Sequence, residues 1–262
     1  SKDEENFAQT LCIELKDPMD VQVNAPGRKK SGTIDTAGIS VPELILEYSD
    51  SDGVTGRSRG FITAEGGMRL DMAKSVPRAT GIFIGTRGRD PIEDAQRYSQ
   101  LEMVGRQDEV LESLKIVEPR LKRLAVLVTG DGTMIYGDIG IERLVPLPLV
   151  GEGTGRLLTI LLAISEARDG AVLIDEIENG LHYSVLEKVW KVIAQSARKS
   201  NTQIFATTLS FECIEAAHQA FSEDDVYDFR LHRLERIDDN ISAITYDKEL
   251  LDASVKAQLE VR

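Results

Sequence analysis

The pattern of apolar and polar positions is clearest between residues 170 and 210. Ala171–Ile174 form a continuous apolar run, which is typical of a strand that is covered on both faces in a parallel sheet. Apolar residues then recur at helical spacing over residues 186–197, and residues 203–208 form a second short apolar run. Two such strands joined by one helix predict a βαβ unit with a right-handed crossover.

Two carboxylates, Asp175 and Glu176, directly follow the first strand of this unit. In open α/β sheets the carboxyl ends of the strands face the crevice in which ligands bind. An apolar strand that ends in Asp-Glu is the Walker B arrangement of nucleotide hydrolases, in which the Asp binds Mg²⁺ and the Glu polarises water as a general base. The alternative interpretation of the pair is the start of a solvated turn.

The chain before this unit divides into a β-rich part and a helical part. Strands are expected at residues 11–15, 42–48 and 60–64, in an antiparallel sheet with one solvated face and a polar loop over residues 50–59. Residues 80–85 predict a buried strand. Asp90 and Pro91 then have the order of a helix N-cap followed by Pro at the first helical position, and we expect helices as far as residue 124.

The other elements are predicted from shorter signals. Two strands flank the Gly-Asp-Gly turn at residues 130–132 and predict a hairpin. The further expected elements are a strand at 139–147, a glycine-rich turn at 151–155, an apolar helix at 157–167, a helix at 210–221, strands at 227–237 and 243–246, and a terminal helix at 248–259.

Composition limits the function classes. The 262 residues include 42% hydrophobic and 29% charged residues, as in a globular protein, and the net charge is −13. This charge argues against wholesale electrostatic binding of nucleic acid, although it leaves a local nucleic-acid contact open. No apolar run approaches the length of a membrane span. The two cysteines, Cys12 and Cys213, have no metal-ligand spacing, so we expect reduced thiols and a cytoplasmic protein.

The order of the motifs carries a family resemblance. GEGTGR at residues 151–156 opens an apolar helix, and it is followed by the strand with Asp175-Glu176, the turn ENGLH and the strand that leads to ATTLS. This order resembles the second half of an ABC-type ATPase of the branch that includes SMC proteins and the overcoming-lysogenization-defect (OLD) family. Within that branch the chain looks like the stand-alone prokaryotic AAA-family ATP-binding proteins. The resemblance covers about residues 80–262.

The resemblance implies an α/β fold of the P-loop NTPase (ABC-type ATPase) class, with a mostly parallel core sheet, an antiparallel β-rich lobe and a helical subdomain. We expect the lobe at residues 1–85, the helical subdomain at 86–125, and the ATPase core at 126–262 with its signature loop, Walker B strand, D-loop and switch strand. The implied cofactors are ATP and Mg²⁺, and the implied assembly is a homodimer that forms on ATP binding.

Site residues are carried over by position. Asp175 matches the Mg²⁺-associated Walker B residue and Glu176 matches the catalytic Glu. GEGTGR matches the signature loop, which binds the γ-phosphate of ATP on a second subunit through backbone N–H groups. The implied nucleotide-binding residues are Gly151, Gly153 and Arg156 of this loop, Asn179 and His182 of the D-loop, and Leu209 at the switch position.

Two departures from the family pattern affect the expected activity. The switch position is usually His in this group, whereas Leu209 can neither donate nor accept a hydrogen bond through its side chain. In addition, no GxxxxGK[ST] phosphate loop (Walker A) occurs in the 262 residues. Because the chain begins at Ser1 rather than Met, we expect that loop to precede residue 1.

Two functions from different classes follow from these observations. The first is an ATP-dependent dimeric switch that binds and hydrolyses ATP and signals to an unknown protein partner, in DNA maintenance or phage defence. The second is a non-catalytic, nucleotide-gated interaction scaffold with a decayed ATPase site, which Leu209 favours. A metal-dependent nuclease and a transporter subunit fit the pattern less well. The sequence names neither the partner nor the pathway.

Overall fold

A computed structural model describes residues 10–16, 43–49, 55–62, 68–71, 80–86, 90–130, 132–237 and 240–257. The chain separates into two compact units, Ser1–Arg78 and Ala79–Arg262. Each unit is described by itself.

The first unit contains a four-stranded antiparallel sheet with the strand order β1-β2-β3-β4. Its strands are β1 (Thr10–Lys16), β2 (Glu43–Ser49), β3 (Thr55–Ile62) and β4 (Met68–Asp71). Strands were expected in the first three of these regions. However, the expected polar loop over residues 50–59 is wrong in its second half, because β3 already begins at Thr55 and pairs there with Ser49. Arg57 and Glu47 form a cross-strand ion pair of 3.3 Å, so polar side chains support this part of the hairpin.

A three-stranded parallel sheet with the order β10-β9-β5 forms the centre of the second unit. Its strands are β5 (Gly81–Ile84), β9 (Ala171–Ile174) and β10 (Gln203–Ala206). The predicted βαβ unit is confirmed, since β9 and β10 pair in parallel and α5 (Leu186–Ser200) connects them. β5 pairs in parallel with β9 and therefore belongs to this core sheet, although the sequence analysis assigned its residues to the first lobe.

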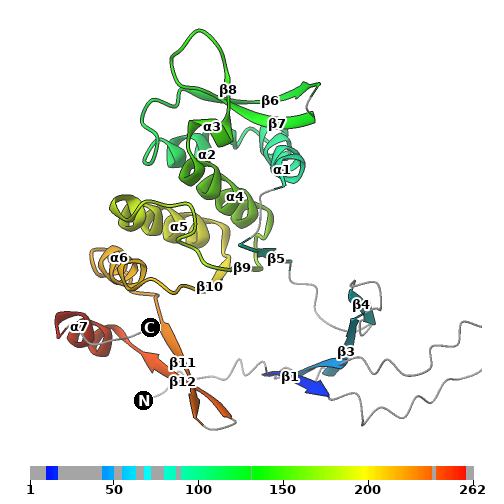
Figure 1. The fold of residues 1–262 in the computed structure, drawn as a ribbon, viewed down its shortest axis with the longest axis vertical. Coiled ribbons are helices and arrows are strands. Elements are labelled where there is room, and N and C mark those ends of the chain that lie inside the picture. The colour runs from blue at the N-terminus through cyan, green and yellow to red at the C-terminus, as the bar shows by residue number, and fades with distance from the viewer. Residues whose placement is uncertain are drawn as a thin grey trace, which may run out of the picture. The chain divides into compact units, whose positions relative to one another are not determined.

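Helices α4 (Glu152–Glu166) and α5 lie on one side of the core sheet (Figure 1). All eleven residues from Thr154 to Ile164 are buried, as expected of a helix that is apolar on every side. The first turn shows one difference from expectation. The segment predicted as a glycine-rich turn is helical from Glu152 onward, so Gly153 and Gly155 lie inside α4. Trp190 of α5 is a core residue, as predicted, and contacts Phe221 and Phe229.

The opposite face of the core sheet is exposed. Phe83 of β5, Leu173 of β9 and Phe205 of β10 are register partners in one row across the three strands. They are 69%, 44% and 52% exposed, whereas their neighbours Val172 and Ile174 are buried against the helices. Parallel sheets are normally covered on both faces, so this apolar row is a surface that further structure would cover.

The helical subdomain contains α1 (Pro91–Met103) and α2 (Gln107–Leu114). The predicted start is confirmed, since the Asp90 side chain accepts hydrogen bonds from the N–H groups of Ile92 and Glu93. The helices end at Leu114 rather than at the expected residue 124, and strand β6 (Arg123–Thr129) follows after a turn. It pairs with β7 (Gly132–Asp138) in the expected hairpin, while Asp131 of the turn lies outside the described residues.

The strand expected at residues 139–147 is wrong for most of its length. Only β8 (Val145–Pro146) is a strand, and α3 (Leu147–Val150) follows it at once. The chain turns after β7 because the Asp138 side chain accepts a hydrogen bond from the N–H of Gly140, which has φ +83°. Such a turn ends the extended conformation that the apolar residues alone suggested.

The C-terminal elements follow the predicted order. They are α6 (Phe211–Ser222), the antiparallel pair β11 (Leu231–Ile237) and β12 (Asn240–Tyr246), and α7 (Lys248–Lys256). None of the helices in the described part of the chain is long and apolar enough to cross a membrane.

Candidate functional site

The acidic pair lies in a turn at the carboxyl end of β9, the central strand of the core sheet. The N–H of Asp175 donates to the Ile84 carbonyl of β5 at 2.9 Å, and the N–H of Thr207 donates to the Ile174 carbonyl at 2.9 Å. Hydrogen bonds from both neighbouring strands therefore fix the start of the turn. Both carboxylate residues are half-buried. Glu176 has φ +46°, a left-handed conformation that costs an L-residue about 1 kcal/mol and that the surrounding bonds must hold.

Thr207 connects this turn to the neighbouring strand β10. Its hydroxyl donates to the Asp175 carboxylate (Oγ1 to Oδ1, 2.7 Å) and accepts a hydrogen bond from the N–H of Glu176 at 2.9 Å. The first bond orients the carboxylate, and the second holds the backbone of the residue with positive φ. Thr207 thus fixes both members of the acidic pair.

Arg156 supports the same turn from the helix side. Its side chain is only 7% exposed. Nη1 donates to the Gly85 carbonyl at 3.0 Å, and Nη2 donates to the Asp175 carbonyl at 2.8 Å and lies 3.4 Å from the Glu176 carbonyl. The guanidinium therefore bonds backbone carbonyls at the ends of β5 and β9, whereas the resemblance implied a contact with phosphate.

The beginning of α4 packs closely against the turn that follows the acidic pair. A Cβ atom at Gly153 would lie 3.0 Å from the Gly180 carbonyl oxygen, and one at Gly180 would lie 2.9 Å from Glu152 Cγ. Gly180 also has φ +76°, which glycine adopts readily. The N-cap residue Gly151 provides no side-chain cap, so the first N–H groups of the helix have no side-chain partner there. The structure thus brings the predicted signature loop and D-loop together within one subunit.

Asn179 and His182, the two residues predicted for the D-loop, make local contacts. Asn179 donates from Nδ2 to the Thr86 carbonyl at 3.4 Å. His182 is exposed, and its Nδ1 accepts a hydrogen bond from the N–H of Ser184 at 3.3 Å, which caps the 3₁₀ turn η2 (Tyr183–Val185). Neither side chain contacts the Asp175 carboxylate.

Leu209, the predicted switch residue, follows Thr207 and Thr208 at the carboxyl end of β10. Leu209 is 74% exposed, so its side chain makes little packing contact. Its backbone N–H donates to Glu178 Oε1 at 3.1 Å, which ties the switch segment to the acidic turn. A larger polar side chain at this position would therefore extend into solvent without disturbing the core.

Sequence reasoning missed Thr207, Glu178 and the carbonyl contacts of Arg156. Thr207 is one residue beyond the pair Ala206 and Ile174, so parallel register alone sets it beside Asp175. That signal was present in the sequence, since both adjacent strands end in polar residues. The bond from Leu209 to Glu178 had no such signal.

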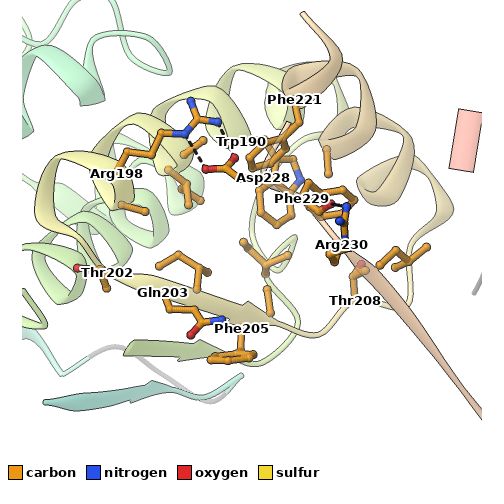
Figure 2. A pocket seen from close by; sticks show the side chains of 18 of the residues that line it. Trp190, Arg198, Thr202, Gln203, Phe205, Thr208, Phe221, Asp228, Phe229 and Arg230 are labelled. Carbon is orange, nitrogen blue, oxygen red and sulfur yellow. Dashed lines mark hydrogen bonds and ion pairs between the residues drawn. The ribbon is translucent and has the colours of Figure 1, made fainter. Parts of the chain in front are cut away.

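A groove runs along the outer edge of β10 (Figure 2). It has a volume of about 760 Å³ and is lined by β10, α5, α6 and the segment before β11. Trp190, Phe221 and Phe229 contribute apolar walls, and Arg198 bonds Asp228 at one end of the groove. β10 has β9 as its only neighbour among the described strands, so its other edge faces this groove.

The donor set is consistent with a magnesium ion that is bound together with phosphate. Mg²⁺ in nucleotide sites takes one or two protein oxygens and completes its shell with phosphate and water. Asp175 and Thr207 provide a carboxylate and a hydroxyl in contact with each other at the strand edge. Among the described residues, no group of three or more His, Cys, Asp or Glu side chains could hold a metal by itself.

Comparison with known proteins decides the family. The family described as "AAA domain, putative AbiEii toxin, Type IV TA system" matches residues 50–208, which is more than half of the chain. The chain belongs to this family of AAA domains. The matched range includes the acidic turn, the beginning of α4 and Thr207, whereas Leu209 lies just beyond it.

Two individual relatives match parts of the chain. The AAA domain is 33% identical over 116 residues to an ATP/GTP phosphatase of Helicobacter pylori, a match that covers 43% of this chain but 31% of that protein. It is 34% identical over 77 residues to an uncharacterized protein of Methanocaldococcus jannaschii, covering 29% of this chain and 68% of the other. The chain therefore matches less than a third of the length of the phosphatase.

The fold class is confirmed by a solved structure. An SMC head, crystallised with the C-terminal winged-helix domain of ScpA, aligns with a TM-score of 0.50 at 11% identity and covers 80% of this chain and 75% of its own. The chain therefore has the P-loop NTPase fold of the SMC heads.

Proposed function

We propose that the protein binds and hydrolyses ATP with Mg²⁺ and that the cycle drives a dimeric conformational switch. The observation that carries this proposal is the acidic turn of Asp175 and Glu176, held between the Thr207 hydroxyl and the Arg156 guanidinium at the carboxyl edge of the central strand. Membership of the AAA-domain family and similarity to a phosphatase of ATP and GTP support it.

Each residue of the turn has a distinct role in this proposal. Asp175 holds Mg²⁺, which neutralises charge on the phosphates, and Thr207 keeps that carboxylate oriented. Glu176 accepts a proton from the attacking water, and its half-buried position leaves a path for that water. Because the backbone of the turn is fixed by bonds from both adjacent strands, little reorganisation accompanies the reaction.

The second subunit completes the site in the proposed dimer. The N–H groups at the start of α4, which no N-cap side chain bonds, contact the γ-phosphate of ATP on the partner subunit together with Gly151 and Gly153. Asn179 and His182 lie along the dimer interface. The close packing of Gly153 against Gly180 supports this arrangement, since it joins the phosphate contact and the interface turn into one rigid surface.

The 262 residues contain no GxxxxGK[ST] motif, so in this proposal residues beyond them supply the phosphate loop. A further strand paired in parallel with the outer edge of β10 would fill the groove, and the loop after it would emerge beside Thr207. A helix after that loop would cover the exposed apolar row of Phe83, Leu173 and Phe205. In this proposal one additional strand, loop and helix would therefore cover both the outer edge of β10 and the exposed face of the core sheet.

The test uses the full-length gene product. We expect it to bind the fluorescent analogue mant-ATP and to release phosphate in a Mg²⁺-dependent reaction. Glu176→Gln should lower kcat by at least about 100-fold while nucleotide binding remains, as expected for loss of a general base. Glu215→Gln, a matched change on the exposed surface of α6, should keep wild-type turnover. A well-folded product that binds no nucleotide would disprove the proposal.

A dimer should be visible in the same material. Glu176→Gln with ATP traps the closed state in this scheme, so size-exclusion chromatography with light scattering should show twice the monomer mass with ATP and the monomer mass without it. The output of the switch, through a protein partner in DNA maintenance or phage defence, is a proposal that rests on resemblance to the SMC and OLD branch.

The alternative function is a nucleotide-gated scaffold without turnover. The exposed aliphatic Leu209 at the switch position favours it, because no side-chain hydrogen bond from there can reach a γ-phosphate. The scaffold predicts ATP-dependent association, no phosphate release, and the same association in wild type and Glu176→Gln. The ATPase assay described above separates the two functions.

A further inference from the structure

Arg156 is a buried cation whose contacts differ from those of a phosphate-binding residue. It belongs to the second turn of α4, and its side chain is 7% exposed. Its Nη1 and Nη2 atoms donate inward, to the carbonyl oxygens of Gly85, Asp175 and Glu176. A residue that binds phosphate across an interface would instead direct its donors toward that interface.

The geometry shows that this side chain connects the ends of two neighbouring strands. A guanidinium is planar and offers several donors in a fixed fork, so it can hold two strand ends at a set spacing. Nη1 bonds the end of β5 at 3.0 Å and Nη2 bonds the end of β9 at 2.8 Å. The carbonyl groups just after β9 that accept these bonds belong to Asp175 and Glu176, the two residues of the acidic pair. Their peptide planes, and therefore the directions in which the two side chains leave the backbone, depend on this fork.

The backbone of Glu176 needs such support. Its φ of +46° is unfavourable for a residue with a side chain. Arg156 approaches the turn from the carbonyl side, while the Thr207 hydroxyl accepts a bond from the N–H of Glu176 on the other side. The turn is thus held at both ends, and the loss of the fork would free it to relax toward an ordinary conformation.

We propose that Arg156 is a positioning residue that orients Asp175 and Glu176 of its own subunit, and that it does not contact the phosphate bound to the partner subunit. This inference rests on the proposed ATPase function and adds a regulatory consequence to it. Because Arg156 lies four residues after the start of α4, a shift of that helix on contact with the partner's nucleotide would move the fork and hence the catalytic turn of the same subunit.

The variants separate positioning from folding and from nucleotide binding. Arg156→Met removes every donor and should lower kcat about 100-fold, the size expected when reacting groups are misplaced by about 1 Å, with KM for ATP within about two-fold of wild type. Arg156→Lys keeps the charge and one donor site, so it should recover part of the lost kcat. An unchanged kcat in Arg156→Met would overturn the inference.

Mixed dimers of the full-length gene product test which subunit the residue serves. The reference dimer pairs a wild-type subunit with Glu176→Gln and has one active site. If the Glu176→Gln subunit also carries Arg156→Met, the active site keeps its own arginine, and we expect the reference rate. If instead the active subunit carries Arg156→Met, we expect the rate to fall about 100-fold. The opposite pattern, or a fall in both dimers, would assign Arg156 to the partner's phosphate and overturn the inference.

Arg97→Met is the matched control. Arg97 also anchors α4 through an ion pair with Glu166, but at the far end of that helix, and it pairs with Glu93 of its own helix. It should lose stability without losing kcat. Circular dichroism at increasing temperature checks that Arg156→Met is folded, and Arg156→Lys replaces it in both mixed dimers if it is not. A wild-type protein without ATP turnover would disprove the proposed function instead, so the two failures are distinguishable.

Discussion

Replacing Thr207 by Val is the most direct test of how the acidic turn is held. The substitution keeps the branched shape of the side chain and removes only the hydroxyl. That hydroxyl makes two bonds, a donation to the Asp175 carboxylate at 2.7 Å and an acceptance from the Glu176 N–H at 2.9 Å. Both members of the acidic pair therefore lose a partner in one change.

The magnitude follows from these two bonds. A hydrogen bond to a charged group contributes about 1.5–3 kcal/mol, and a neutral one about 1 kcal/mol. Thr207 is exposed, so water replaces much of both, and we expect global stability to fall by only about 1 kcal/mol. Loss of orientation acts on the chemical step more strongly. About 1.4–2.8 kcal/mol of lost transition-state stabilisation corresponds to a fall in kcat of about 10-fold to 100-fold.

The assay is phosphate release by the full-length gene product over a range of Mg²⁺ concentrations. Thr207→Val should require more Mg²⁺ for half-maximal rate in addition to its lower kcat, because the carboxylate that holds the ion is no longer fixed. Thr207→Ser restores the hydroxyl and should restore most of the rate. Thr245→Val is a matched control, since Thr245 is also exposed and also bonds a side chain, His232, on a distant hairpin.

The reasoning would be refuted by a Thr207→Val protein whose kcat and Mg²⁺ requirement lie within a factor of two of wild type. Equal losses in Thr207→Ser and Thr207→Val would also refute it, since a side chain that keeps the hydroxyl would then be no better than one that lacks it.

Three further predictions concern other parts of the second unit. Gly170→Ala would bring a Cβ atom to 2.1 Å from a backbone carbonyl oxygen, so urea titration should show a loss of roughly 3 kcal/mol, whereas Gly81→Ala, with no atom within 4 Å, should stay within about 0.5 kcal/mol of wild type. Leu209→His adds a donor for the γ-phosphate at an exposed position and should raise kcat about 10-fold; no gain would mean that the switch works differently. Hydrogen bonds from Arg198 hold the pKa of Asp228 below its ordinary value, so Arg198→Met should lower the melting temperature at pH 7. The difference should shrink as the pH falls below the ordinary aspartate pKa of about 4 and then through the lowered pKa of the folded state, since the carboxyl group is then protonated in both states; a difference that grows on acidification would contradict the ion pair.

The core sheet could be predicted because its signals are local. A run of four apolar residues with polar residues after it identifies β9, and the apolar positions of α5 match the buried ones almost one for one. The predictions from sequence were wrong where pairing with a neighbouring strand, or a turn, decided the local structure instead of the polarity of the residues. Polar residues 55–59 form a strand because β2 lies opposite them, and residues 139–144 do not form one because Asp138 closes a turn.

The candidate site was predictable only in part, for a related reason. Spacing along the chain located Asp175 and Glu176 at the end of a strand, and that is where they lie. It also predicted correctly that α4 would be apolar and buried, but periodicity identifies the face of a helix and not the atoms that the face meets. Arg156 carries a charge on a face that is otherwise buried, and a buried charge has to find several partners. In this fold the available partners are the carbonyl groups at the carboxyl ends of parallel strands, which are the same groups that determine how the acidic pair is directed. A buried arginine one turn into the helix after a glycine-rich segment is therefore, by itself, a reason to look for a strand end beneath it.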